Sequence, residues 1–303
     1  MATTKVIRRR IASVKSTQQI TRAMKLVAAA RLRRSQASLI NARPYHEALR
    51  RVADSLLASA SDAAAPAENA APAALVIIVT SDRGLCGGYN SNVIRFYEDQ
   101  ASRVSSSGLE PKLFDVGRKG SEHFKRIGQP LEGERINNLP RLATIELARA
   151  ISDKVLHDYR SGAISEADIV YSRFHSPLSQ PPTFERLLPI EASKKSDGET
   201  AEAPRKDGEA AGGTSTQTDY LIEPSAAELI PVVMRSYVEA SIYHALLEAE
   251  TSFFAAQMTA MDSATNNAAD MISRLTLEMN RARQAQITKE LMDIVGGAEA
   301  LRG

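Results

Sequence analysis

An unbroken heptad stripe of apolar residues runs along the C-terminal part of the chain. Alternating steps of four and three residues give fifteen positions from Val233 to Ala282, without a Pro or Gly anywhere between them. The stripe positions that are not apolar are His244, Thr251 and Thr265. A 3.5-residue period held over about seven heptads is typical of a long helix that supercoils left-handedly around a partner helix.

A second helical pattern occupies the N-terminal end, over residues 3–58. Apolar residues recur there in two runs with steps of four and three residues, one at Ile7, Ile11 and Val14 and the other at Ile20, Met24 and Val27. The C-terminal stripe predicts a helix over residues 232–296, about 97 Å long at 1.5 Å per residue. Because the two helices lie at opposite ends of the chain, we expect them to form an antiparallel coiled coil.

Between the two helices the hydrophobic period changes. Short apolar or alternating runs predict strands at residues 75–79, 112–117, 167–176 and 183–190. Helical patterns separate these runs, from about residue 89, at 117–128 and at 143–162. Strands that alternate with helices over about 120 residues indicate an α/β domain with a largely parallel sheet.

Composition sets the boundaries between these zones. A low-complexity linker at residues 59–72 separates the N-terminal coiled-coil helix, 1–58, from the α/β domain, 73–190. Residues 191–219 are rich in Gly, Ser, Thr and charges, and such a segment cannot bury enough apolar surface to offset its ordering entropy. We expect a disordered surface loop there, or a regulatory insert that folds on contact with a partner. Residues 220–303 form the return segment and the C-terminal helix.

Charge is distributed unevenly along the chain. The first 51 residues carry thirteen Lys or Arg and one Glu, a net charge of +12, although the whole chain has a formal charge of only +2. From Glu223 onward eleven acidic residues outnumber six basic ones. The basic helix is therefore expected to face acidic partners, both within the chain and outside it. The absence of Trp and the aromatic content of 5% argue against a nucleic-acid reader.

Other compositional features exclude several classes of protein. A single cysteine rules out an internal disulfide and a Cys-based zinc cluster, and it fits a reducing compartment. The longest wholly apolar run, residues 73–79, is far shorter than the roughly 20 residues that a membrane-spanning helix needs. The basic N-terminus is not followed by the apolar core of a signal peptide. We expect no direct membrane insertion.

The glycine-rich segment SDRGLCGGYN, residues 81–90, is the most conspicuous candidate for chemistry, because it follows a predicted buried strand. Its glycines fit neither the dinucleotide-binding nor the phosphate-loop spacing, so a structural turn is favoured over a small-ligand site. Cys86 beside Arg83 could be an activated thiolate, but no base is evident nearby. The five histidines lack metal-binding spacing. We expect no catalytic, cofactor or metal site.

Three segments carry a resemblance to the gamma subunits of F-type ATP synthases. They are IRRRIASVKSTQQITRAMKLVAAARLRR at residues 7–34, SDRGLCGGYN at 81–90, and ITKELMDIVGGAEA at 287–300. The last segment is similar to the family signature at Ile287, Thr288, Glu290, Asp293, Gly297, Ala298 and Ala300. The segment before Tyr220 is longer than in the usual bacterial form.

The resemblance implies a fold and a function. Its fold is an antiparallel coiled coil of the terminal helices with a Rossmann-like α/β domain at the foot. Its function is that of a non-catalytic rotor shaft, which couples proton flow through the membrane ring to ATP synthesis and hydrolysis. Its partners would be the alpha and beta subunits of the catalytic head, the epsilon subunit and the c-subunit ring. Its location would be peripheral, on the cytoplasmic face of the bacterial inner membrane.

The resemblance also implies contacts between rotor and head. It maps a contact with the beta subunit onto Arg283, Gln284 and Thr288. The basic residues expected to meet acidic loops of the beta subunits are Arg8, Arg9, Arg10, Lys25, Arg31, Arg33 and Arg34. The plain alternative for both sets is the solvated face of a long helix.

Two other classes of protein stay open at this point. A basic coiled coil could organise nucleic acid, in which case binding would fall steeply with salt. A nucleotide-dependent enzyme could be built on the α/β domain, although the phosphate loop is missing. The regular apolar stripe and the embedded α/β domain disfavour the nucleic-acid protein. Identifying the subunits of the native complex, isolated from membranes, would distinguish these two classes and the rotor shaft from one another.

Overall fold

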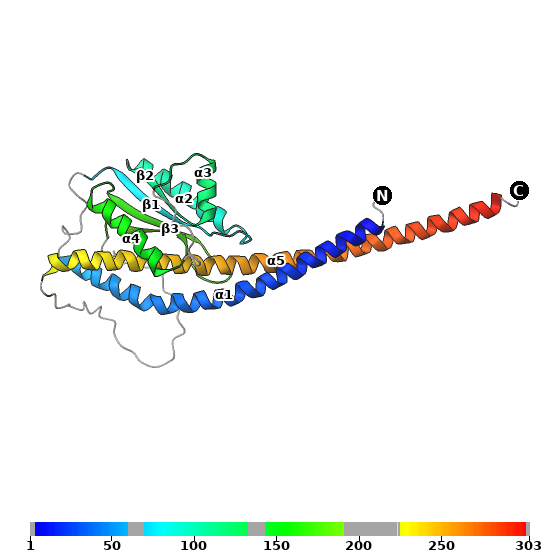
Figure 1. Cartoon of the computed structure of the whole chain (residues 1–303), viewed down its shortest axis with the longest axis horizontal. Helices are drawn as coiled ribbons and strands as arrows, with labels where there is room; N and C mark the ends of the chain where they lie inside the picture. Colours follow the sequence, from blue (N-terminus) through cyan, green and yellow to red (C-terminus); the bar gives the residue numbers. More distant parts are fainter. Residues whose placement is uncertain (1–3, 60–69, 133–142, 191–222, 224, 301–303) are drawn as a thin grey trace, which may run out of the picture.

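Two long helices form a rod, and an α/β domain lies against one end of it (Figure 1). The computed structural model describes residues 4–59, 70–132, 143–190, 223 and 225–300. The loop predicted at residues 191–219 lies outside the described residues, as does most of the predicted linker. The predicted coiled coil with an inserted α/β domain is confirmed.

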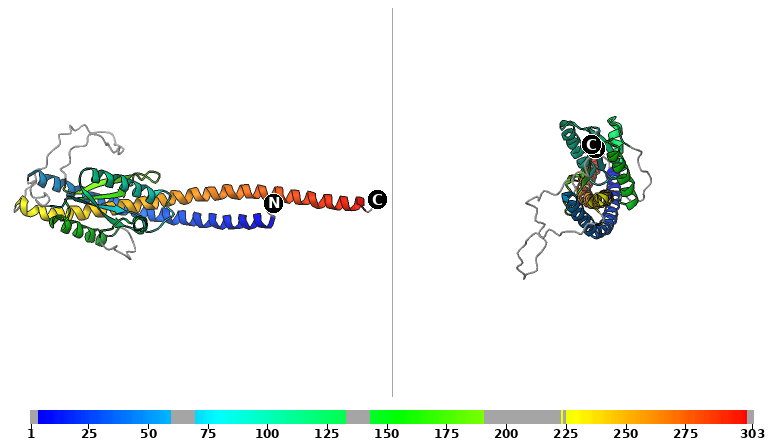
Figure 2. Two further views of the ribbon diagram at one scale, coloured as in Figure 1. Left: turned by 90° about the horizontal axis from the view of Figure 1, so that it is seen from above. Right: turned by 90° about the vertical axis from the view of Figure 1, so that its left-hand side faces the viewer.

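The rod consists of α1, Thr4–Ser59, and α5, Ala226–Ala300, which run antiparallel and side by side (Figure 2). The 75 residues of α5 exceed the predicted span of 232–296 at both ends. Pro231 removes one backbone donor near the helix start, and the helix continues through it. Gly296 and Gly297 do not end the helix either. The expected boundaries were therefore too narrow, because glycine and proline weaken a helix without always stopping it.

The three polar positions of the heptad stripe all meet polar side chains of α1. Thr251 lies 2.7 Å from Ser35 between hydroxyl oxygens, and both residues are fully buried. The hydroxyl oxygens of Thr265 and Thr21 lie 2.8 Å apart. The ring of His244 stacks on the ring of His46. These contacts join residues about 200 to 250 positions apart, and they identify which turn of α1 faces which turn of α5.

The α/β domain contains one four-stranded sheet in the order β2-β1-β3-β4. Its strands are β1, Ala73–Val79; β2, Glu110–Val116; β3, Glu166–Ser172; and β4, Pro182–Leu188. The first three pair in parallel, and β4 pairs antiparallel with β3. The expectation of a largely parallel sheet is thus confirmed, with one antiparallel strand at the edge.

Helices cover both faces of this sheet. The alternating side chains of β1 divide between two hydrophobic clusters, with Leu75 and Ile77 in one and Val76 and Ile78 in the other. The first cluster packs against α1, α5 and α4, Ile145–Arg160. The second packs against α2, Tyr89–Ser106, and α3, Arg118–Arg126. Burial on both faces explains why β1 is an uninterrupted apolar run.

Buried polar contacts hold the α/β domain on α5. The hydroxyl of Tyr89 donates to the carbonyl oxygen of Ala249 at 3.0 Å. The hydroxyl of Ser252 donates to the carbonyl oxygen of Ser172 at 2.9 Å. The carboxylate of Glu248 accepts the backbone N–H of Phe174 at 2.6 Å, and burial raises the pKa of this carboxyl group. The domain and the rod therefore meet through directional contacts as well as apolar packing.

The buried hydroxyl pair of the coiled coil gives a first prediction. Thr251 donates its only hydroxyl hydrogen to the carbonyl oxygen of Leu247, so Ser35 must donate to Thr251. Thr251→Val keeps the shape but leaves the Ser35 hydroxyl without an acceptor, and we expect a loss of about 1–3 kcal/mol in the free energy of unfolding.

The double variant Ser35→Ala with Thr251→Val removes both polar groups. It is expected to recover part of the stability that Thr251→Val loses, as measured by urea unfolding of the full chain. A double variant that is less stable than either single variant would contradict the assignment of Ser35 as donor.

Candidate contact surface and glycine-rich turn

The basic side chains of α1 lie on the outside of the rod. Exposed residues among the predicted contacts are Arg8, Arg9, Arg10, Arg31, Arg33 and Arg34. They fall into two groups, one near the start of α1 and one midway along it. Because consecutive residues of a helix point about 100° apart, each group spreads its charge around the helix and not along one edge.

Two of the predicted contact residues have partners inside the chain. The Lys25 ammonium lies 2.5 Å from a carboxylate oxygen of Asp262 on α5, and both side chains are close to half exposed. The Arg31 guanidinium lies over the ring of Phe254, 5.8 Å from its centroid. The exposed ion pair adds about 1 kcal/mol or less to stability. Asp262 balances the charge of Lys25, so Lys25 offers a partner less net charge than Arg33 or Arg34.

The second set of predicted contacts lies at the same end of the rod as Arg8–Arg10. The Thr4 hydroxyl lies 3.2 Å from the side-chain oxygen of Gln286, which places the start of α1 beside this part of α5. Arg283, Gln284 and Thr288 are all exposed. The fold therefore brings the two predicted contact sets together, although more than 270 residues separate them along the chain.

Sequence analysis missed the apolar surface at the end of α5. Side chains that are half exposed or more are Ile287, Leu291, Met292, Ile294 and Val295. A signal was present, because continuing the heptad steps past Ala282 leads to Gln286 and Lys289. The apolar residues thus leave the stripe that faces α1, and they form an exposed patch of the kind that marks an interaction site.

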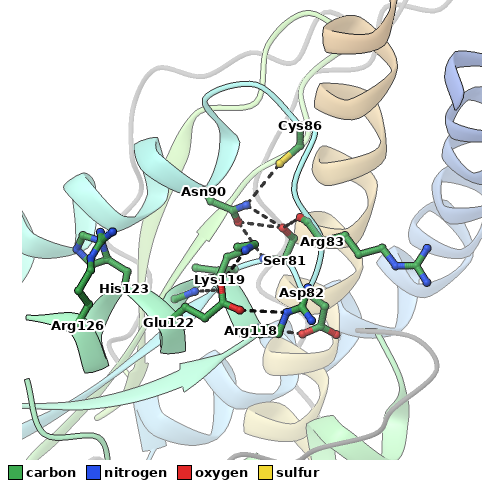
Figure 3. A network of polar contacts seen from close by, with 12 residues as sticks. Ser81, Asp82, Arg83, Cys86, Asn90, Arg118, Lys119, Glu122, His123 and Arg126 are labelled. Atoms are coloured by element: carbon green, nitrogen blue, oxygen red, sulfur yellow. Dashed lines mark hydrogen bonds and ion pairs between the residues drawn. The ribbon is translucent and has the colours of Figure 1, made fainter. Parts of the chain in front are cut away.

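The glycine-rich turn, residues 81–90, is held together by its own side chains (Figure 3). Ser81 donates its hydroxyl to the carbonyl oxygen of Arg83 at 2.6 Å, and its backbone N–H to the Asn90 side-chain oxygen at 3.0 Å. The Asn90 amide donates to Ser81 and to the sulfur of Cys86. In Figure 3 the Arg83 guanidinium points away from this network. The arrangement is that of a cross-linked structural turn.

The backbone N–H groups at the start of the neighbouring helix α3 donate to other groups of this chain. Backbone N–H groups at the N-terminus of α3 could bind an anion. Here the N–H of Arg118 donates to the Asp82 carboxylate at 2.9 Å, and that of Lys119 donates to the carbonyl oxygen of Ser81. The N–H of Gly120 donates to the Thr80 hydroxyl at 2.9 Å. The first three backbone N–H groups of α3 are therefore all bonded to other groups of this chain, so none of them is free to bind an anion.

Cys86 does not have the surroundings of a reactive thiolate. Its side chain is buried, and burial raises the pKa of the thiol. Across the described part of the chain, no cluster of three or more His, Cys, Asp or Glu side chains is arranged to hold a metal ion. In those same residues no helix is both long and apolar enough to span a membrane.

Comparison with known proteins identifies the family. A sequence model of the ATP synthase family matches residues 3–301. The ATP synthase gamma chain of Heliobacterium modesticaldum is 42% identical over 297 residues, which cover 97% of this chain and 98% of the relative. The gamma chain of Moorella thermoacetica is 41% identical, with both chains covered completely. This chain belongs to the ATP synthase gamma-chain family.

Solved structures agree with the fold. A chain of the Euglena gracilis mitochondrial ATP synthase matches with a TM-score of 0.67 at 18% identity, covering 98% of this chain and 94% of that one. A chain of the Tetrahymena thermophila mitochondrial ATP synthase, from its central stalk and c-ring, matches with a TM-score of 0.59 at 24% identity. It covers 81% of this chain and 99% of that chain. At such identities the likeness shows a shared architecture.

The residues predicted to match the family signature lie on the exposed end of α5. Ile287, Thr288, Glu290, Asp293 and Gly297 are exposed there. The Glu290 carboxylate accepts a hydrogen bond from the Gln286 amide at 3.0 Å, one helical turn away. The side chains of Ala298 and Ala300 lie outside the described residues. Because the described signature residues point to solvent, packing within this chain does not explain why these residue types occur here.

A second prediction concerns the glycine next to the turn. Gly117 has φ of 102°, and a Cβ added there would lie 2.1 Å from the carbonyl oxygen of Thr80. Gly117→Ala is therefore expected to lower the free energy of unfolding by more than about 2 kcal/mol, measured by thermal or urea unfolding.

Gly84→Ala is the matched control in the same region. A Cβ at Gly84 would meet no atom within 4 Å, and no positive φ is required there. This variant should stay within about 0.5 kcal/mol of the parent chain. Equal stability of the Gly117 and Gly84 variants would show that the close approach to Thr80 is not a constraint.

Proposed function

We propose that this chain is the central rotor shaft of an F-type ATP synthase. In this function the rod turns inside the ring of alternating alpha and beta subunits, and the α/β domain joins the epsilon subunit and the c-subunit ring at the foot. Rotation couples proton flow to ATP synthesis or hydrolysis by changing which beta subunit is closed on nucleotide. The complex would lie at the bacterial inner membrane, with this chain peripheral on the cytoplasmic side.

One observation carries the proposal beyond family membership. The pairing of α1 and α5 leaves a rod whose free end is basic on α1 and apolar on α5, while the α/β domain lies against the other end. A rod that was only a spacer would not need an exposed apolar end. We infer that the catalytic head encloses this end and that the ring binds the opposite one.

The basic groups of α1 suit a contact that must form and break at every step. Exposed ion pairs are individually weak, about 0–1 kcal/mol. Arg8, Arg9, Arg10, Arg31, Arg33 and Arg34 can therefore meet successive acidic loops of the beta subunits without trapping the rotor at one angle. Lys25 is assigned to this surface as well, where a beta-subunit carboxylate would compete with Asp262.

The hydrogen bonds around the glycine-rich turn and the burial of Cys86 disfavour a catalytic function of this chain. The donors at the start of α3 are engaged by Asp82, Ser81 and Thr80, and burial raises the pKa of the Cys86 thiol. We propose that the chain is a non-catalytic subunit without cofactor or metal, and that it binds no nucleic acid. Catalysis in the complex then belongs to the head that the rod contacts.

The contact on α5 gives a third prediction. Gln284 and Thr288 are four residues apart and share a helix face, where both can reach beta-subunit carboxylates. Gln284→Ala with Thr288→Ala, and separately Arg283→Ala, should leave the complex assembled but lower ATPase turnover and ATP-driven proton pumping. One charge-assisted hydrogen bond of about 1.5–3 kcal/mol corresponds to a loss of roughly ten- to a hundredfold if it forms only in the transition state.

The assembled complex must be measured alongside its rate. Arg103→Ala, an exposed arginine on α2, is the matched control and should keep parental turnover. Subunits that copurify with the chain from membranes report assembly, and alanine keeps the helix intact. Parental turnover and pumping in both α5 variants, at equal assembly, would leave these residues as solvated surface.

A fourth prediction separates a shaft from a nucleotide-dependent enzyme. Because the donors beside the turn are already engaged, the isolated full chain should bind ATP no more tightly than millimolar and should not hydrolyse it. Isothermal titration calorimetry and phosphate release measure the two properties. Micromolar ATP binding by the purified chain would favour an enzyme built on the α/β domain.

A further inference from the structure

Two histidines meet across the coiled coil at the level of the α/β domain. The ring of His46 on α1 stacks on the ring of His244 on α5, with centroids 4.6 Å apart and planes 9° from parallel. The ring of Tyr237 lies one step further along, 6.3 Å from that of His46. The His46 Nε2 atom lies 3.3 Å from the hydroxyl of Ser241. The stack is thus part of the contact between the helices, and nothing in the function proposed above uses it.

This is a different kind of contact from the other two polar positions of the stripe. Ser35 with Thr251 and Thr21 with Thr265 are hydroxyl pairs, which keep the same charge between pH 5 and 8. An imidazole changes its charge within that range. The coiled coil therefore carries one titratable layer among neutral ones, at the stripe position occupied by His244.

Charged groups face the stack from every element that packs around it. On α1 they are Arg43, Glu47 and Arg50; on α5 they are Glu239 and Glu248; from the β3–β4 hairpin they are Arg173 and Glu185; and α4 contributes Arg149. Arg149 and Glu239 pair at 3.2 Å across a groove of about 440 Å³ that both histidines line. The Glu248 carboxylate lies 3.8 Å from His244 but accepts a hydrogen bond from Phe174. The acidic groups are therefore largely engaged elsewhere.

Burial makes the neutral form of both rings the stable one. Desolvation lowers the pKa of His244 to about 3, with further lowering by His46, Arg43 and Arg173. Desolvation also lowers the pKa of His46, and Glu185 only partly opposes it. Two neutral imidazoles can stack at 4.6 Å, whereas two imidazolium ions at that distance repel each other.

We propose that the His46–His244 stack is an acid-sensitive latch: when the histidines take up protons, α1 separates from α5 beside the α/β domain, while the coiled coil beyond Ser35 stays paired. The separated segment is the part of α1 around His46, which lines the open groove. The latch is a regulatory device in the shaft, and it is independent of whether the chain rotates.

The direction of the pH effect follows from proton linkage. Both pKa values are lowered in the closed state, so the open state binds more protons below the ordinary histidine pKa of 6.5. The stability of the latch is complete above pH 6.5 and falls as the pH drops below it. Glu248 acts in the opposite direction, because its pKa is raised in the closed state. The hydrogen bond that the Glu248 carboxylate accepts from Phe174 joins α5 to the α/β domain, so it is kept when α1 moves away.

Amide hydrogen exchange of the full chain between pH 7.5 and 5 tests the latch, after correction for the intrinsic pH dependence of exchange. Each proton taken up on opening makes the opening constant rise about tenfold per pH unit below pH 6.5. A segment of α1 that has lost its partner helix is only marginally helical in water, so its own hydrogen bonds open as well. We therefore expect up to a hundredfold loss of protection per pH unit in residues 42–50 of α1. Residues 26–36, which contain the Ser35 layer, should keep their protection and serve as the internal reference.

Histidine variants test how many protons are taken up when α1 separates from α5. His46→Gln or His244→Gln should each halve the slope of the logarithm of the opening constant against pH. The double variant should abolish this slope. His157→Gln, an exposed histidine on α4, is the matched control and should keep the full slope. A pH-independent wild type, or an unchanged slope in the double variant, would overturn the proposal.

A titration of the unaltered chain covers the case in which a variant fails to fold. In proton NMR, the ring signals of His46 and His244 should stay in the neutral position as the pH falls below 6.5, the ordinary pKa of histidine. Their shift should then accompany the loss of protection in residues 42–50. Titration of both rings near pH 6.5 with α1 still protected would show that the stack tolerates charge, and there would be no latch.

Discussion

The pairing of α1 with α5 is the contact on which the rest of the structure depends. Both ends of the chain form the rod, so the α/β domain has to be inserted between them and is placed by docking on α5. Apolar residues at heptad positions supply the driving force, but they would tolerate a shift of one heptad. Such a shift, about 10 Å along the axis, would part Ser35 from Thr251 and leave a fully buried hydroxyl without a partner. The polar layers therefore select one register from several apolar ones.

The carboxyl ends of the parallel strands are closely tied to neighbouring elements of the chain. In open parallel sheets, ligands bind at the carboxyl ends of the strands, where loops offer free donors. Here the loop after β1 is cross-linked through Asn90, and the start of α3 is capped by Asp82 and Thr80. On the other side of the same loop, Tyr89 binds the backbone of α5. The carboxyl edge of the sheet is thus also part of the attachment to the rod.

Sequence patterns predicted the elements well and their contacts poorly. Each predicted strand and helix has a counterpart in the structure. Burial of one or two faces of an element imposes a regular spacing of apolar residues, and this spacing can be recognised in the sequence. The heptad stripe even singled out His244, Thr251 and Thr265 as exceptions. It could not identify His46, Ser35 and Thr21 as their partners, since a stripe contains no information on register between two helices. Likewise, the charge imbalance indicated acidic partners within the chain, but only the structure pairs Lys25 with Asp262.

The offset between the two long helices has a mechanical consequence. Thr4 lies beside Gln286, so α5 continues for fourteen residues, about 21 Å, past the partner of the first described residue of α1. A pair of helices that interlock through their side chains resists bending and twisting more than one helix does. The rod therefore changes stiffness along its length, and its compliant section coincides with the residues predicted to match the family signature. The work done by a load applied at that end would first be stored as elastic energy in a single helix.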